Sequence, residues 1–358
     1  MLRNDSTSAD ASLPKIKAVL GFSASILGLV VLTGCGAGDD NEPAATPMTG
    51  MTANLFMEGA VLASSIVDCT LSDGTASTCR SITIAGFPQN HEIGPFCPST
   101  TSSSAAEGGI WFDGRAVYDI DGPFIENLAT LYDDDNWRLY DDDGSVHITD
   151  TPEAFDAAAR PDVDPAYQNY CVEGRMEWLE NGEPVPTTVL IPTTPVFAAE
   201  TGRALGTVGL TLNGVIIAAS APVDAILGAY TIAAFDDCGG HINPYDGYHL
   251  HGARGCSEVG VAEAGETPIF AYAMDGFPIH SPLAGGSKAA GLDECQGHST
   301  DTLGYHYHAA NVEENAVLSC FKGVTVQGQG GGLPPPGARP GGPPPGERPN
   351  GPPPEAGA

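Results

Sequence analysis

Two histidine-rich segments of the sequence have the residue types and the spacing of metal ligands. The first runs from Cys238 to His251, and the second runs from Cys295 to His308, 57 residues later. Each reads Cys-x-Gly-His, six further residues and Tyr-His-x-His, and seven of the fourteen positions are identical. Together they hold six of the nine His of the chain, which are His241, His249, His251, His298, His306 and His308. We interpret the two segments as an internal repeat that carries the chemistry of the protein.

The spacing of these His has a physical meaning. On a strand, the two His of Tyr-His-x-His project from one face with Cα atoms about 6.5 Å apart, so they can share one metal ion. The residue between them is Leu250 in the first segment and Tyr307 in the second, a change that packing tolerates and coordination would not. The third His follows a loop in which Gly240 or Gly297 would allow a tight turn. It completes a three-His set with a position left open for water or substrate, and imidazole suits Cu and Zn.

Other interpretations of these residues stay open at this point. One His-x-His on a strand is usually a hydrogen-bonded surface pair, whereas two copies with the same third His favour a metal site. Cys238 and Cys295 could supply thiolate ligands, although in an exported protein a disulfide is the more common state of Cys. His147 stands alone in a predicted hairpin, and we expect it to have a structural role.

The elements that must position these His are predicted to be mostly strands. The chain has 46 Gly and 30 Pro, a share that favours turn-rich β architecture over a helical bundle. Segments rich in β-branched and aromatic residues predict strands, and Pro or polar residues before apolar ones predict two short helices. The strands are expected at 81–84, 117–120, 207–217 and 267–273, and the helices at 124–132 and 151–159. The predicted fold class is mainly β, sandwich- or barrel-like, with a few short helices.

Two Asp-rich stretches, 133–136 and 141–144, lie next to predicted short strands at 137–140 and 146–149. Asp-Gly between two strands indicates a hairpin turn first of all. Clustered carboxylates could also hold Ca²⁺, but the spacing of the twelve-residue calcium loop is missing.

The N-terminus has the features of an export signal. Lys15 and Lys17 precede an apolar stretch of 15 residues at 18–32, which is too short to span a bilayer comfortably. Leu-Thr-Gly-Cys at 32–35 resembles the lipobox of bacterial lipoproteins, which implies lipidation of Cys35 and, with Gly36 next, anchoring in the outer membrane. The alternative is an ordinary signal peptide with a Cys that lies there by chance.

The remaining eight Cys fit an oxidising compartment. An even number of Cys in an exported chain predicts disulfides, here four, and the spacing alone does not give their connectivity. The candidates are Cys69, Cys79, Cys97, Cys171, Cys238, Cys256, Cys295 and Cys320. Cys69 and Cys79 flank a turn, so a bridge that clamps a short hairpin is the most plausible single pair.

Charge excludes one class of function, and composition divides the chain into parts. With 14 Lys and Arg against 45 Asp and Glu, the net charge is −31, which excludes a nucleic-acid binder. A Pro- and Gly-rich end cannot build a core. We predict a signal peptide at 1–34, a flexible tether at 35–54, a folded body at 55–325 with an N-terminal part (55–200) and a His-repeat part (201–325), and a disordered tail at 326–358.

Several motifs resemble the YHYH-domain family of secreted proteins. The resemblance covers about 80–325. It rests first on the Tyr-His-Tyr-His at 305–308 and on both Cys-x-Gly-His elements. Three further segments contribute: 273–279, the strand-turn element 206–217, and the Gly-x-Pro segment 86–91, which ends in His91. Two departures matter: the first tetrad is Tyr-His-Leu-His, and His280 stands where the family usually has Tyr. The second departure argues against His280 as an obligatory ligand. The resemblance implies no particular reaction.

Three functions are therefore in competition. The first is a cell-envelope protein in which the six His bind one or two Cu or Zn ions. The second is a metal-dependent hydrolase or oxidoreductase, in which Asp275, Asp237 or Glu294 would serve as base. The third is a structural or ligand-binding surface module with hydrogen-bonded His. No substrate or partner protein is indicated by the sequence.

Overall fold

The computed structural model of the chain describes residues 50–51, 53–159, 163–259 and 266–329. The chain divides into two units, Met1–Ala45 and Thr46–Ala358, and all described residues belong to the second. The predicted signal peptide, Cys35 and the tail from residue 330 onward lie outside the described residues. Met51 and Val326 are both buried, so the packed part includes residues on either side of the limits 55–325.

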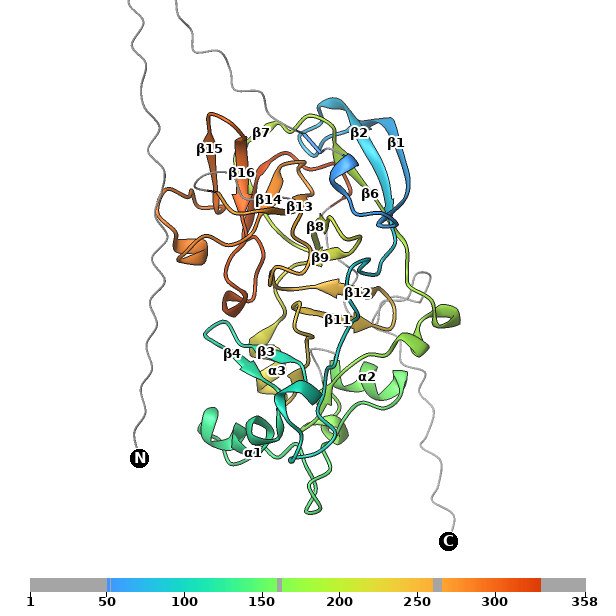
Figure 1. Cartoon of the computed structure of the whole chain (residues 1–358), viewed down its shortest axis with the longest axis vertical. Coiled ribbons are helices and arrows are strands. Elements are labelled where there is room, and N and C mark those ends of the chain that lie inside the picture. The colour runs from blue at the N-terminus through green and yellow to red at the C-terminus, as the bar shows by residue number, and fades with distance from the viewer. Residues whose placement is uncertain (1–49, 52, 160–162, 260–265, 330–358) are drawn as a thin grey trace, which may run out of the picture. The chain divides into compact units, whose positions relative to one another are not determined.

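An eight-stranded sheet is the central element of the fold (Figure 1). Its strands are β8 (Thr207–Thr211), β9 (Ile216–Ala218), β11 (Gly240–Asn243), β12 (Gly247–Leu250), β13 (Ile269–Ala273), β14 (Pro278–His280), β15 (Gly297–Thr300) and β16 (Gly304–His308). Their order across the sheet is β11-β12-β9-β8-β13-β14-β16-β15. The sheet is open, with β11 and β15 at its edges, so the described residues form no closed barrel.

The two halves of this sheet pair in the same way. In the first half, β12 pairs antiparallel with β11 and parallel with β9. In the second half, β16 pairs antiparallel with β15 and parallel with β14. The antiparallel pair β8 and β13 joins the halves. Each Tyr-His-x-His strand is therefore held between two neighbours, while the 57-residue sequence repeat itself stays a prediction.

Smaller sheets and short helices complete the described part, which has 17 strands and three α-helices. The other strands are β1 (Val61–Thr70), β2 (Ala76–Ile84), β3 (Ile110–Phe112), β4 (Val117–Asp119), β5 (Cys171–Val172), β6 (Thr187–Pro192), β7 (Phe197–Arg203), β10 (Ile232–Ala233) and β17 (Cys320–Gly323). The α-helices are α1 (Gly122–Leu131), α2 (Pro152–Ala159) and α3 (Val223–Gly228). Short 3-10 helices occur at Ala53–Leu55, Ala105–Glu107, Pro165–Tyr167, Met176–Trp178, Glu180–Gly182, Gly286–Lys288 and Val312–Glu314. The mainly β fold predicted from the sequence is confirmed.

Both predicted helices are present, and side-chain caps explain where they begin. The Asp121 carboxylate accepts a hydrogen bond from the backbone N–H of Phe124 (2.7 Å) at the start of α1. The Thr151 hydroxyl accepts one from the N–H of Ala154 (3.1 Å) at the start of α2. Such caps satisfy backbone donors that have no partner inside the helix. The third helix, α3, has only six residues, too few to produce an amphipathic pattern, and the sequence analysis missed it.

The Asp-rich hairpin is smaller than predicted. Strands were expected at 137–140 and 146–149, but only a single bridge joins Tyr140 to Val146. Between them the N–H of Gly144 donates to the carbonyl of Asp141 (2.9 Å), which is the predicted turn. The carboxylate of Asp143 accepts from the N–H of Ser145 (2.9 Å). These are the contacts of a turn, and calcium binding in the Asp-rich loops stays a prediction.

Four disulfides bridge the eight Cys, as predicted. They are Cys69–Cys79, Cys97–Cys171, Cys238–Cys256 and Cys295–Cys320. The first clamps the β1–β2 hairpin, as the spacing suggested. Cys238 and Cys295 are each consumed in a bridge, so the alternative in which they bind metal as thiolates is wrong.

Candidate metal centres

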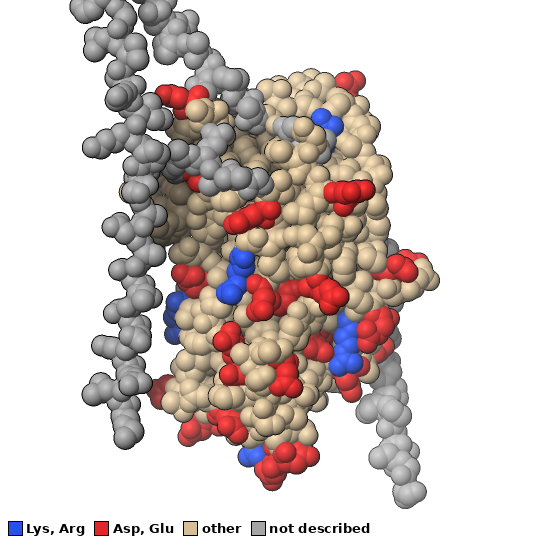
Figure 2. Space-filling model, viewed as in Figure 1, with Lys and Arg blue, Asp and Glu red and all other residues tan. Residues whose placement is uncertain are grey.

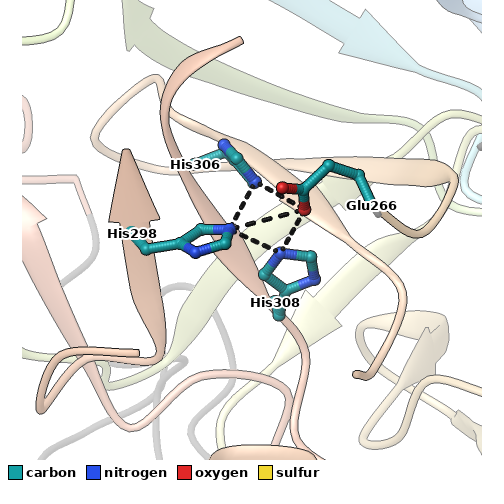
Figure 3. Close-up of side chains that lie close together, drawn as sticks. All are labelled: Glu266, His298, His306 and His308. Atoms are coloured by element: carbon teal, nitrogen blue, oxygen red, sulfur yellow. Dashed lines mark hydrogen bonds and ion pairs between the residues drawn. The ribbon is translucent and has the colours of Figure 1, made fainter. Parts of the chain in front are cut away.

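The three His of the second segment and one Glu form a four-residue cluster around one point (Figure 3). His298 on β15 lies directly across from His306 on β16, and His308 follows two positions along the same face. The Nε2 atom of His298 lies 3.0 Å from that of His306 and 3.2 Å from that of His308. We call the group of Glu266, His298, His306 and His308 the closed site.

Glu266 is the member of the closed site that the sequence analysis missed. Its Oε2 atom lies 3.4 Å from Nε2 of His298, 3.2 Å from that of His306 and 3.1 Å from that of His308. Burial raises the pKa of Glu266, but the adjacent imidazoles, led by His306, offset this and leave the pKa below its usual value. Glu266 is remote from the second segment in sequence and has no motif around it. It reaches the site because it precedes β13, which pairs with β14, and β14 in turn pairs with β16.

The spacing of these donor atoms fits a tetrahedral ion. A zinc ion with bonds of about 2.0 Å would hold ligand atoms about 3.3 Å apart. Five of the six distances within the closed site are between 3.0 and 3.4 Å. A square arrangement would have two long diagonals, so at least one of these five distances would be long. The five distances therefore exclude a square and match the edges of a tetrahedron.

The other ring nitrogen of His306 and that of His308 are already engaged. His306 Nδ1 lies 3.0 Å from the carbonyl oxygen of Gly304, and His308 Nδ1 lies 3.1 Å from that of Ser281. A carbonyl can only accept, so the hydrogen-bond network assigns the N–H to Nδ1 and leaves a lone pair on Nε2. Metal-binding His usually donate their second N–H to such a partner. Two imidazole lone pairs and a carboxylate oxygen thus face one point beside the Nε2 atom of His298, and one metal ion could bind all four atoms.

His280 lies beside the closed site and is not part of it. It is buried on β14, and its ring centroid is 4.7 Å from that of His306. Its Nδ1 lies 2.5 Å from the carbonyl oxygen of Thr267, and burial lowers its pKa to about 4. This agrees with the sequence interpretation that His280 is no obligatory ligand.

The first His segment forms a similar group of three. His241 on β11 lies across from His249 on β12, and their Nε2 atoms are 3.1 Å apart. His249 Nδ1 lies 3.1 Å from the carbonyl oxygen of Gly247, and His251 Nδ1 lies 2.7 Å from that of Ala219. Burial lowers the pKa of His249 to about 4 and that of His251 to about 3. We call His241, His249 and His251 the open site, because a fourth donor does not belong to this group within the described part of the chain.

The Tyr of each tetrad faces away from the His, as predicted. Tyr248 donates a hydrogen bond to Asp236 (2.8 Å), and Tyr305 donates one to Asp293 (2.9 Å). In the second segment, Tyr307 also points into the core and donates to Asp275 (2.5 Å). The acidic residue before each Cys-x-Gly-His therefore anchors the back of the strand that carries the His.

The Gly of Cys-x-Gly-His has a different role from the one expected. Neither Gly240 nor Gly297 has a positive φ angle, so a tight turn is not the reason for glycine. A Cβ atom on Gly240 would lie 2.4 Å from the hydroxyl oxygen of Tyr248, and one on Gly297 would lie 2.0 Å from that of Tyr305. Glycine is required because the tyrosine ring lies against its backbone.

The acidic residues proposed as bases do not face either site. The carboxylate of Asp275 is buried and also accepts hydrogen bonds from the N–H groups of Phe277 (3.3 Å) and Gly323 (2.9 Å). Asp237 is exposed. Glu294 forms an ion pair with Lys322 at 2.9 Å. None of the three is placed among the metal-ligand candidates of the described residues.

Two further His lie elsewhere. His147 contacts the carbonyl oxygen of Asn169 and the carboxylate of Asp141, each at 3.1 Å, which is the structural role expected of it. His91 lies near Cys238 and Cys256, but the disulfide between these two Cys leaves no thiolate for a metal.

Comparison with known proteins agrees with the motifs. A family model described as YHYH protein matches residues 188–286. The match includes the open site and β14 but ends before His298, so it is shorter than the range of about 80–325 expected from the motifs. No curated protein and no solved structure matched the chain. Residues 188–286 thus match the model of the YHYH protein family, which is the family that the motifs of the sequence resemble.

Proposed function

We propose that the protein is a lipid-anchored component of the bacterial cell envelope that binds two transition-metal ions, zinc or copper. One ion would occupy the closed site and one the open site. The two groups of donor atoms are separate, which favours two ions over one shared ion.

One observation carries this proposal. In both sites, Nδ1 of each His of the Tyr-His-x-His segment lies on a backbone carbonyl, so its Nε2 lone pair faces the group, and the three Nε2–Nε2 distances to the third His are 3.0 to 3.2 Å. One N–H of the third His could satisfy only one of the two lone pairs that face it, whereas a metal ion binds both. Burial also lowers the pKa of His249, His251 and His308, which keeps these imidazoles neutral, and neutral imidazole is the form that binds metal.

The donor sets also restrict the metal. Imidazole suits both zinc and copper, whereas Cu(II) prefers square or tetragonal arrangements. The tetrahedral closed site, with three imidazoles and one carboxylate, favours zinc.

Titration of chelator-treated protein with zinc tests the proposal. We expect two equivalents to bind, because each convergent group offers at least three neutral or anionic donors. Competition with a coloured chelator would measure the binding of both equivalents of zinc. Binding at exposed carboxylates would be weak and non-saturating, and a titration of that kind would contradict the proposal.

The location is proposed from the N-terminal sequence, which resembles a lipobox. Among the described residues, no helix is both long enough and apolar enough to cross a membrane. The four disulfides support an oxidising compartment. The acidic charge of the chain, visible on the face in Figure 2, gives no attraction to anionic lipids. Membrane affinity would therefore come from acyl chains on Cys35.

The variant Cys35→Ser should leave the protein unprocessed or release it from the membrane fraction, because one Cys carries the acyl chains that provide membrane affinity. Fractionation followed by immunoblotting measures this. A matched control is Cys69→Ser with Cys79→Ser, which removes one disulfide and leaves the anchor in place. Normal maturation and membrane association of Cys35→Ser would refute the lipobox interpretation.

A further inference from the structure

The two His sites differ in what lies at the fourth position. In the closed site, the Glu266 carboxylate lies within 3.4 Å of all three Nε2 atoms and completes a tetrahedron of protein ligands. Zinc sites that serve structure are closed in this way, whereas sites that react or bind substrate keep one position for an outside donor. The open site has three His and, within the described residues, no carboxylate in the group.

A cavity of about 190 Å³ adjoins the open site, and all three of its His line the wall. Most of the remaining wall is apolar, with Phe155 and Ala158 of α2, Val172 of β5, Ile226 of α3 and Ala233 of β10 among the lining residues. Phe235 also lines the cavity, and its ring centroid lies 4.9 Å from that of His241. The three-His group thus faces an apolar chamber.

The size of the chamber restricts what it can hold. An apolar cavity of about 150 Å³ in another protein is large enough for benzene. A chamber of about 190 Å³ therefore has room for a six-membered ring with one small substituent. A peptide or a sugar chain could place only one such group inside it.

Charge restricts the head group of the ligand. Asp246 lines the same cavity, and burial raises the pKa of its carboxyl. A desolvated carboxylate is stabilised by an O–H or N–H donor and disfavours a second anion. The net charge of −31 also repels anions at long range.

We propose that the open site holds its metal ion with three His and takes, at the fourth position, a small neutral molecule with an apolar body and one hydroxyl or amino group. The oxygen or nitrogen of this group would coordinate the ion, its hydrogen would face Asp246, and the body would fill the apolar chamber. The closed site would hold its ion with protein ligands only. This inference rests on the proposed metal binding and adds a ligand class to one of the two sites.

Cobalt(II) in place of the native metal gives a visible spectrum that reports on coordination, and phenol serves as the probe. Three forms of the mature full-length protein are compared: the wild type, His306→Gln with His308→Gln, which keeps the open site, and His249→Gln with His251→Gln, which keeps the closed site. Phenol should change the spectrum saturably in the first two forms and leave the third unchanged. Benzoate, of similar size but anionic, should bind at least about tenfold more weakly.

A cavity-filling variant separates the chamber from the metal. Ala158→Leu should weaken phenol binding at least about tenfold, because the added methylenes occupy the chamber, and should keep two equivalents of cobalt, because Ala158 is no ligand. Three results would overturn the inference and leave the proposed metal binding intact. The wild type could take up two equivalents of cobalt and show no spectral response to phenol. The form that keeps only the closed site could respond to phenol, or the wild type could bind benzoate as tightly as phenol. A protein that takes up no cobalt would overturn both.

Discussion

Replacing His306 and His308 together with Gln should reduce zinc binding from two equivalents per chain to one. The two substitutions remove half of the four donors of the closed site, and Gln has nearly the volume of His but is a poor zinc ligand. Because the open site shares none of these residues, its ion should stay. Elemental analysis after dialysis against a weak chelator measures the change.

The reciprocal variant is the matched control. His249→Gln with His251→Gln should also lose one equivalent, and combining all four substitutions should lose both. If the six His instead converge on a single ion, either pair alone would abolish binding. Unchanged zinc content in the His306→Gln and His308→Gln variant would contradict the assignment of the closed site.

A substitution on the opposite face of the same strand separates metal loss from destabilisation. Tyr305→Ala should lower the free energy of unfolding by about 2–4 kcal/mol through the cavity it leaves. The Tyr305 ring packs against Phe277 with centroids 4.8 Å apart, away from the metal ligands. This variant should therefore be less stable than the wild type and still bind two equivalents.

Acidification should strongly destabilise the metal-free protein. In the folded state, burial lowers the pKa of His249 to about 4 and that of His251 to about 3, whereas in the unfolded chain His titrates near 6.5. As the pH falls below 6.5, the unfolded chain binds protons that the folded protein does not, so stability decreases. For two such groups the loss from pH 8 to pH 5 is about 4 kcal/mol. Denaturant unfolding at a series of pH values, in the presence of a chelator, measures it.

The variant His249→Gln with His251→Gln provides the comparison. On acidification from pH 8 to pH 5, this variant should lose about 4 kcal/mol less stability than the wild type, because the two titrating groups are absent. Asp275 acts in the opposite direction, since burial raises its pKa to about 6 and stability is gained as the pH falls through that value. Asp275 is present in both proteins, so its effect cancels in the difference. Equal pH dependence of the two proteins would show that these His are not held in their neutral form.

The strands that carry the His ligands could be predicted from the sequence because residues close together in the chain determine which side chains share a face. The alternation in Tyr-His-x-His specified which side chains share a face, and β12 and β16 confirm it. The hairpin disulfide Cys69–Cys79 was predictable for the same reason, since its two Cys flank one turn. Both features depend on residues a few positions apart, where strand periodicity alone decides the geometry.

Features that depend on the pairing of distant strands could not be predicted. Glu266 joins the closed site because β14 pairs in parallel with β16, and nothing near Glu266 in the sequence signals that pairing. The wall of the chamber beside the open site includes residues of α2, β5, α3 and β10, which come from separate parts of the chain. The need for glycine at position 297 could not be predicted either, because it arises from the contact with the Tyr305 ring and not from the local backbone conformation.

The metal content of the protein as isolated is the decisive measurement for metal binding by the two His sites. The mature chain would be produced without a His tag, purified without chelators and analysed for all transition metals. The account predicts two ions per chain, zinc or copper, in line with the two separate groups of converging ligands. Protein that contains no transition metal as isolated, and takes up none when supplied with zinc or copper, would contradict it and leave a module of hydrogen-bonded His in its place.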